Sequence, residues 1–299
     1  MKLTKTKLAA AVAMAALGVG MAMPASAGLL SIRLTDATQA FFTCPDSVGV
    51  VSACDLNPLA NEITLNPVTA NAALGGALAA FTIVGLSAAS NFITGNPNAA
   101  VITSSGNLTA TLVPGILPLI IEVSQTDWLK PVGQNRTLSQ GATTTFTNAG
   151  TGDFASFHAL NDQANLIWAG NLAVDPVPVV LTAALAAALP AGAGDDFVTP
   201  NVRFNKGPGS PPGCTAEVGF IQSCAGVSQL GGILETNPFS LTQRIVIATG
   251  ASPVGGALIR VQFTDAATKF ATVPEPASVL LFGAGILGLA LTRRRKKIE

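Results

Sequence analysis

Apolar and polar residues alternate in short runs along most of the chain, which is the pattern of β-strands that bury one of their two faces. Glycine, proline and asparagine separate nearly all of these runs, as turns require. The chain is therefore expected to be all-β, with an antiparallel, sandwich-like arrangement of strands. The alternation predicts strands at Leu29–Leu34, Ala80–Gly85, Asn107–Leu112, Ile116–Val123, Thr143–Thr147, Asn165–Trp168, Phe197–Phe204, Ser240–Ala248 and Ala257–Phe263.

Two segments of the chain differ from the regular alternation. Ile116–Val123 is almost entirely apolar, which predicts a central strand that is buried on both faces. Val179–Leu189 is rich in alanine and leucine and lies between prolines, so we expect a short helix on a crossover there. A weak boundary within the β-rich region is expected at Ala191–Asp196.

The N-terminus carries a secretory signal. Three lysines fall within the first seven residues, residues 8–23 carry no charge, and Pro24 precedes the small residues Ala25-Ser26-Ala27. This order predicts a cleavable signal peptide over residues 1–27, cut by signal peptidase between Ala27 and Gly28. The apolar part is short for a membrane span, which favours removal over the alternative of an uncleaved anchor helix.

The C-terminus carries a second, membrane-directed segment. Residues 277–292 are uncharged and would form a helix of roughly 24 Å, somewhat shorter than the hydrocarbon core of a bilayer. Five consecutive cations follow, Arg293 to Lys297, and these are expected to stay in the cytoplasm. The sequence thus predicts a single transmembrane helix over 277–292, with residues 28–276 on the outer side of the membrane.

Directly before this helix the chain reads Val273-Pro274-Glu275-Pro276, which the two prolines keep out of a helical conformation. Together with the short apolar segment and the basic end, residues 273–297 resemble the PEP-CTERM sorting signal. The resemblance implies processing by an exosortase-type membrane enzyme. It also implies a surface or matrix protein of a Gram-negative bacterium that makes exopolysaccharide. An ordinary C-terminal anchor is the alternative. The same tail is also catalogued under an ice-binding label, which describes the tail only.

The charges are distributed unevenly along the chain. It has 16 cations and 16 anions in total, but three lysines lie in the leader and five cations in the tail. Residues 28–272 keep 8 cations against 14 anions, a net charge of −6. A mildly acidic domain without a basic patch is not expected to bind nucleic acid.

The four cysteines form two pairs with nine residues between the partners. Cys44 to Cys54 and Cys214 to Cys224 both read C-x3-V-G, two apolar residues, one further residue, a small residue and C. In an exported protein an even count at matched spacing predicts disulfides, and we favour the local pairs Cys44–Cys54 and Cys214–Cys224 among the three possible connectivities. Zinc binding is disfavoured because the paired ligands of structural zinc sites lie two to four residues apart, whereas nine residues separate the cysteines of each pair here.

Residue types that carry catalysis are scarce. The only histidine, His158, is expected to be a structural strand or loop residue, because no nucleophile-elbow motif accompanies it. Fourteen acids leave a glycosidase pair open, but no spacing singles one out. Asp195-Asp196 lacks the regular oxygen ligands of a calcium loop. No catalytic residue, metal or cofactor is therefore predicted.

The expected function is that of an exported, non-enzymatic cell-surface or extracellular-matrix protein. It would be held in the inner membrane by the C-terminal helix before processing, with exopolysaccharide as a candidate partner. The alternative is a secreted carbohydrate-binding or carbohydrate-active protein. Ice binding would need a regular threonine array, and only Thr143–Thr145 with Thr147 suggest one. A Thr-Asp-Ala echo, at residues 35–37 and 264–266, suggests either two strands of one sandwich or two related halves.

Overall fold

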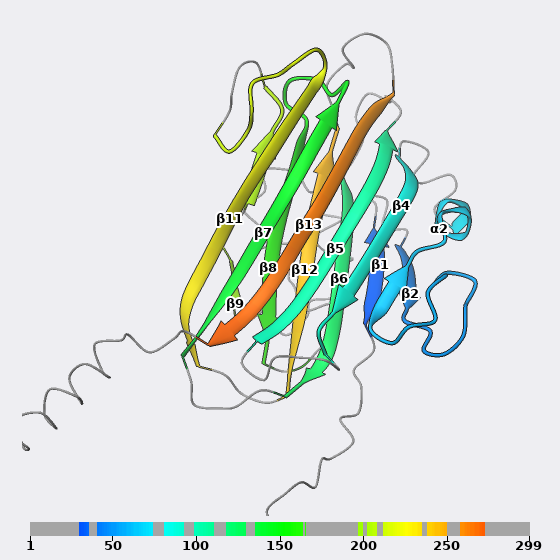
Figure 1. The fold of residues 1–299 in the computed structure, drawn as a ribbon, viewed down its shortest axis with the longest axis vertical. Coiled ribbons are helices and arrows are strands. Elements are labelled where there is room, and N and C mark those ends of the chain that lie inside the picture. The colour runs from blue at the N-terminus through cyan, green and yellow to red at the C-terminus, as the bar shows by residue number, and fades with distance from the viewer. Residues whose placement is uncertain are drawn as a thin grey trace, which may run out of the picture.

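The structure is a computed structural model of the full chain. The residues that it describes are 30–35, 41–73, 81–92, 99–110, 118–129, 135–163, 165, 197–199, 202–207, 212–234, 238–249 and 258–272. Within these ranges the chain forms two antiparallel sheets packed face to face (Figure 1), which confirms the expected all-β antiparallel sandwich.

One layer is a seven-stranded sheet. Its strand order is β10-β8-β12-β6-β1-β2, and β9 pairs with β8 beyond the end of β10. The bounds are β1 Ser31–Thr35, β2 Phe41–Pro45, β6 Leu119–Trp128, β8 Phe154–Asp162, β9 Phe197–Val198, β10 Val202–Asn205 and β12 Phe239–Ala248.

The other layer is a six-stranded sheet with the order β11-β7-β13-β5-β4-β3. The bounds are β3 Glu62–Thr64, β4 Phe81–Ser90, β5 Ala99–Ala110, β7 Asn135–Thr147, β11 Ile221–Leu234 and β13 Ile259–Thr272. The short helix α2, Pro67–Ala73, lies beside β4 at one edge of this sheet (Figure 1).

Aromatic side chains join the two sheets in the core. The rings of Phe157 on β8 and Phe263 on β13 have centroids 6.0 Å apart, and those of Phe239 on β12 and Phe270 on β13 are 5.3 Å apart. Both pairs meet edge to face, an arrangement that adds stability beyond the apolar area buried. The two sheets therefore share one core, in which β13 contacts strands of the opposite layer.

Most of the strands predicted from the sequence are present. The segment Ile116–Val123 was expected to be central, and the described β6 lies inside its sheet between β12 and β1. The expected strand Phe197–Phe204 is divided into β9 and β10. In Asn165–Trp168 only Asn165 is described, and it is not in a strand.

Four strands were not predicted: β2, β3, β8 and β11. All nine residues of β8 are buried, and its apolar and polar residues alternate only over the short stretch Ala155–Ala159. β11 contains several glycines, and one of them, Gly226, lies where Phe204 and Val202 pack closely, since a Cβ there would be 3.1 Å from both side chains.

Both ends of the described body lie at the same end of the sandwich. Ser31 pairs with Ser124 in the second half of β6, and Thr272 pairs with Arg136 at the start of β7, the next strand along the chain. β1, which ends at the threonine of the first Thr-Asp-Ala, and β13, which contains the second, lie in opposite sheets of one sandwich. This arrangement agrees with the first of the two interpretations of the echo.

Several predictions fall outside the described residues: the signal peptide 1–27 with its cleavage site, the helix at 179–189, the boundary at 191–196, and the sorting motif and helix over 273–297. Of the described helices, none has the length and apolar character needed to cross a bilayer.

Candidate functional site

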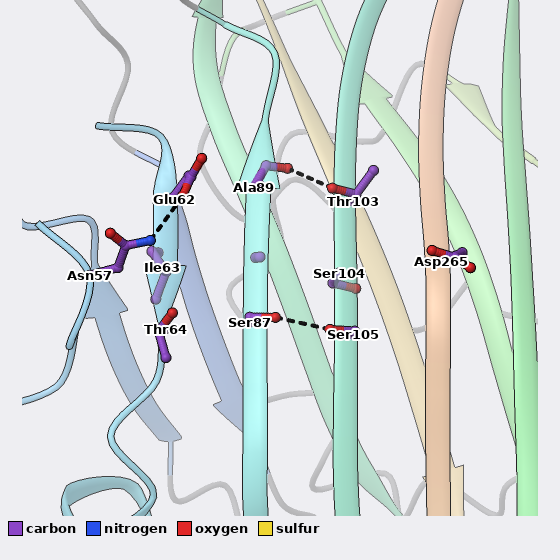
Figure 2. A pocket seen from close by; sticks show the side chains of 11 residues that line it. Asn57, Glu62, Ile63, Thr64, Ser87, Ala89, Thr103, Ser104, Ser105 and Asp265 are labelled. Carbon is purple, nitrogen blue, oxygen red and sulfur yellow. Dashed lines mark hydrogen bonds between the residues drawn. The ribbon is translucent and has the colours of Figure 1, made fainter. Parts of the chain in front are cut away.

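A groove lies on the outer face of the six-stranded sheet, across β3, β4, β5 and β13. It has a volume of about 380 Å³. Figure 2 shows Asn57 and Glu62 on one side of the groove and Asp265 on the other, with small side chains of β4 and β5 between them. The groove therefore has two acidic walls, which we call the Glu62 wall and the Asp265 wall.

The floor of the groove is made of small side chains. The hydroxyls of Ser87 on β4 and Ser105 on β5 share a hydrogen bond of 2.9 Å, and the hydroxyl of Thr103 donates to the carbonyl of Ala89 at 3.4 Å (Figure 2). These side chains are neutral and short, so they leave room above the sheet. The floor can both donate and accept hydrogen bonds.

The Glu62 wall is positioned by the loop that follows the first disulfide. Glu62 accepts a hydrogen bond of 2.9 Å from the side-chain amide of Asn57. The preceding residue, Asn61, has a φ of 63°, and the Asp46 carboxylate accepts a hydrogen bond of 2.5 Å from its backbone N–H. Asparagine adopts this left-handed conformation more readily than most residues, so the sequence supports the turn that sets β3.

A buried carboxylate organises this loop. Asp55 is fully buried and accepts four hydrogen bonds, from the backbone and hydroxyl of Ser47 and from the backbones of Asn57 and Thr64. The disulfide Cys44–Cys54 ends at the adjacent residue. The Glu62 wall is thus held by a disulfide and by a buried polar cluster.

The Asp265 wall is created by a bulge in β13. The register shifts between Phe263 and Ala266 against β5, and Asp265 has a φ of 52°. A bulge of this kind changes the direction in which a side chain points. The ring of Phe263, at the start of the bulge, packs against the backbone of Gly106 on β5. A Cβ at residue 106 would lie 2.4 Å from this ring, so the ring fills the space that a side chain would need.

The groove is electronegative. No lysine or arginine is among the residues that line it, and no described residue hydrogen-bonds or ion-pairs with the Asp265 carboxylate. Behind the Glu62 wall, burial raises the pKa of Asp46, the Asn61 backbone hydrogen bond lowers it, and the charges of Asp55 and Glu62 raise it further. Negative charge is therefore concentrated on this side of the sandwich.

The two disulfides have the pairing expected from the spacing, Cys44–Cys54 and Cys214–Cys224. The first lies beside the groove, whereas the second closes a hairpin against β11, at the far edge of the same sheet. Gly49 and Gly219, at matching places in the two loops, both have positive φ, which explains the repeated valine-glycine pair.

His158 lies in β8 and is buried. Its Nε2 is 3.3 Å from the hydroxyl of Ser156, which is also fully buried. His158 therefore lies in a strand, which is one of the two placements, strand or loop, expected from the sequence. In the described part of the chain, no group of three His, Cys, Asp or Glu side chains could hold a metal ion.

The threonines proposed for an ice-binding array are divided between two faces. Thr144 is completely buried, whereas Thr143, Thr145 and Thr147 are partly exposed on the outer face of the sheet. Sequence reasoning missed the groove itself, since nothing in the order of residues brings Glu62 near Asp265. The strongest signal available was the asparagine that precedes Glu62 and the Thr-Asp-Ala sequence that contains Asp265.

The fold and the groove define a disulfide-linked antiparallel β-sandwich with an acidic, hydroxyl-lined surface groove. Residues 272–296 match the PEP-CTERM protein-sorting motif, so the resemblance of the tail is confirmed and implies export, membrane-associated sorting and exosortase processing. No curated protein matches the chain.

Among solved structures, the enzymatically active domain of bacteriophage CBA120 tailspike protein 4 is 10% identical, with 65% of this chain and 20% of that chain covered and a TM-score of 0.24. The carbohydrate-binding module TmCBM61 in complex with β-1,4-galactotriose is 8% identical, with coverage of 64% and 88% and a TM-score of 0.24. A promiscuous carbohydrate-binding module of the β-sandwich superfamily is 9% identical, with coverage of 81% and 74% and a TM-score of 0.25. These likenesses are too remote to assign a ligand or an activity.

Proposed function

We propose that the chain is a cell-surface or extracellular-matrix protein of an exopolysaccharide-producing Gram-negative bacterium, without catalytic activity of its own. The match of residues 272–296 to the PEP-CTERM motif carries this proposal. Signal peptidase removes residues 1–27, and the apolar segment 277–292 holds the protein in the inner membrane until an exosortase acts on the tail. The released or transferred domain then stays at the surface or in the matrix.

Two disulfides in the folded domain support this location, because disulfides persist in oxidising compartments outside the cytoplasm. The low content of charge, with threonine, serine and asparagine providing much of the polar surface, agrees with an extracellular domain whose surface forms hydrogen bonds.

Intact-mass analysis of protein recovered from cells with and without their exosortase tests the proposal. The expected result is a mass that begins at Gly28 and ends within the tail only when the exosortase is present. A variant with Pro274, Glu275 and Pro276 replaced by alanine should keep its tail, whereas Ser278→Ala serves as the control outside the motif. An identical mass in both strains would overturn exosortase processing.

A second function is favoured by the groove, namely binding of a polysaccharide. Sugars present many hydroxyls, and the floor of serine and threonine hydroxyls between two carboxylates provides matching donors and acceptors. The candidate ligand is the exopolysaccharide with which proteins of this sorting class are associated.

The spacing of the two walls supports binding over hydrolysis. β3 and β13 are separated by three strand spacings, or about 14 Å. Glycosidases place their two carboxyl groups about 5–9.5 Å apart. Glu62 is in addition held by Asn57, on its own side of the groove.

Glycan binding can be measured by microarray with the full-length protein in detergent, followed by a hydrolysis assay on each sugar that binds. Binding without release of reducing ends is the expected result, and Thr103→Ala should weaken it. Thr145→Ala, on β7 of the same face, is the control that should leave binding unchanged. Turnover by the wild-type protein would overturn the non-enzymatic assignment.

A further inference from the structure

We infer that the groove prefers a glycan with protonated amino groups, that is, a polysaccharide of de-N-acetylated amino sugars, over a neutral or an acidic one. This inference rests on the proposed glycan-binding function of the groove. It follows from where the charges of the lining residues lie.

The two walls present carboxylates to the same open space. Asp265 accepts no hydrogen bond from the described residues, and the bulge of β13 places it on the outer face, where it is exposed. Glu62 uses one oxygen, Oε2, to accept from Asn57, and no described residue donates to the other oxygen. Each wall therefore keeps an acceptor that an incoming cation can pair with.

No described cation forms an ion pair with Glu62 or Asp265. Lys269 and Arg260 lie on the same strand as Asp265, but in register with Val101 and Thr109, toward the two ends of β5 and outside the lining residues. Glu62 faces no cation across its own strand pair, where its neighbour is Ala89. An anionic sugar entering the groove would thus meet two like charges, whereas an ammonium group would meet two opposite charges.

The spacing of the walls also determines the size of ligand. With about 14 Å between β3 and β13, one metal ion cannot bridge the two carboxylates, but an oligosaccharide of several rings can contact both. Amines on separate rings of one chain would then pair with separate walls, while ring hydroxyls contact Ser87, Thr103 and Ser105 on the floor. The positioning of Glu62 by a disulfide-linked loop and of Asp265 by a bulge keeps both walls in place before the ligand arrives.

The test compares chitohexaose with its fully de-N-acetylated form by calorimetry, on the full-length protein in detergent, at a pH where the amines are protonated. The de-N-acetylated sugar should bind more tightly at low salt and lose this advantage at high salt. Glu62→Gln and Asp265→Asn should each weaken its binding by about 1.5- to 5-fold, which is the range of one exposed ion pair. Each of the two changes should weaken the binding of chitohexaose less than it weakens the binding of the de-N-acetylated sugar.

Thr103→Ala is the matched variant, because it removes a floor hydroxyl without changing charge and should weaken both sugars alike. Hexaguluronate, an acidic oligosaccharide, is measured as the third ligand. Equal affinity for chitohexaose and its de-N-acetylated form, or tighter binding of hexaguluronate than of the de-N-acetylated form, would overturn the preference for amines while leaving the groove as a glycan site. If none of the three oligosaccharides bound, the glycan-binding function would fail, and the inference with it.

Discussion

Arg244 on β12 donates two hydrogen bonds to the carboxylate of Glu122 on β6, from Nε at 3.1 Å and from a terminal nitrogen at 2.9 Å. The other carboxylate oxygen accepts from Nε of Arg33 on β1 at 2.6 Å. All three side chains are at most 9% exposed. They lie in register across three neighbouring strands, on the face opposite the core positions Ile121 and Val123.

Because Glu122 is shared, its removal should destabilise the fold more than removal of either arginine. Glu122→Ala leaves two buried guanidinium groups without their common carboxylate, and we expect a loss of about 3–5 kcal/mol in the free energy of unfolding. Arg244→Met leaves the pair of Glu122 and Arg33 intact and should cost less. Urea denaturation measures both variants, and a greater loss for Arg244→Met would contradict the sharing.

The support beneath the Asp265 bulge can be tested with two glycines. Gly106→Ala places a methyl group where the ring of Phe263 now lies, and the forced repacking should cost about 1–3 kcal/mol. Gly85→Ala, on the adjacent strand β4, is the control, because its Cβ would have no neighbour within 4 Å. Thermal unfolding monitored by circular dichroism should show a clear loss for the first variant and little change for the second.

The two disulfides provide a matched pair of variants. Each closes a loop of about 11 residues, so replacing both cysteines of either bridge with serine should cost roughly 2–3 kcal/mol in stability. Only the Cys44–Cys54 variant should also change ligand affinity at the groove, because that loop carries Asn57 and leads into Glu62. Equal effects of the two variants on affinity would show that the first loop does not position the groove.

The raised pKa of Asp46 predicts an unusual dependence of the protein's stability on pH. Its pKa is raised in the folded protein, mainly by burial, so the folded state keeps a proton that the unfolded state releases. Stability should therefore fall as the pH rises from about 3.8, the ordinary value, through the raised pKa. Asp46→Asn removes this penalty and should be more stable than the wild type at neutral pH, with the difference vanishing near pH 4.

Asp55→Asn is the contrasting variant to Asp46→Asn. Asp55 accepts four hydrogen bonds, and an amide nitrogen in place of one oxygen would face donors. A loss of about 1–3 kcal/mol is expected at neutral pH. Urea titrations of both variants at pH 4 and pH 7 check the two predictions, and a destabilised Asp46→Asn at pH 7 would contradict the first.

The sequence predicted the features that depend on neighbouring residues. Alternation and the apolar run 116–123 identified the strands with one buried face and the central strand β6, and matched spacing identified both disulfides. The groove could not be predicted, because Glu62 and Asp265 are 203 positions apart and meet only through the order of β3, β4, β5 and β13.

The polar residues inside the core could not be predicted from the alternation of apolar and polar residues either. Gln243 on β12 accepts a hydrogen bond from Ser104 on β5, and Thr268 donates to Gln140, all within the buried interior. A period-two pattern treats such residues as surface positions. Their burial depends on partners in the opposite sheet and on neighbouring strands, which sequence order does not reveal.

The two ends of the folded body, at Ser31 and Thr272, lie toward the same pole of the sandwich, one in each sheet. The residues that precede Ser31 and those that follow Thr272 are therefore joined to the domain at one pole. The Cys214–Cys224 hairpin lies toward the opposite pole, where Cys224 pairs with Thr144 near the end of β7, so this disulfide is remote from both attachment points.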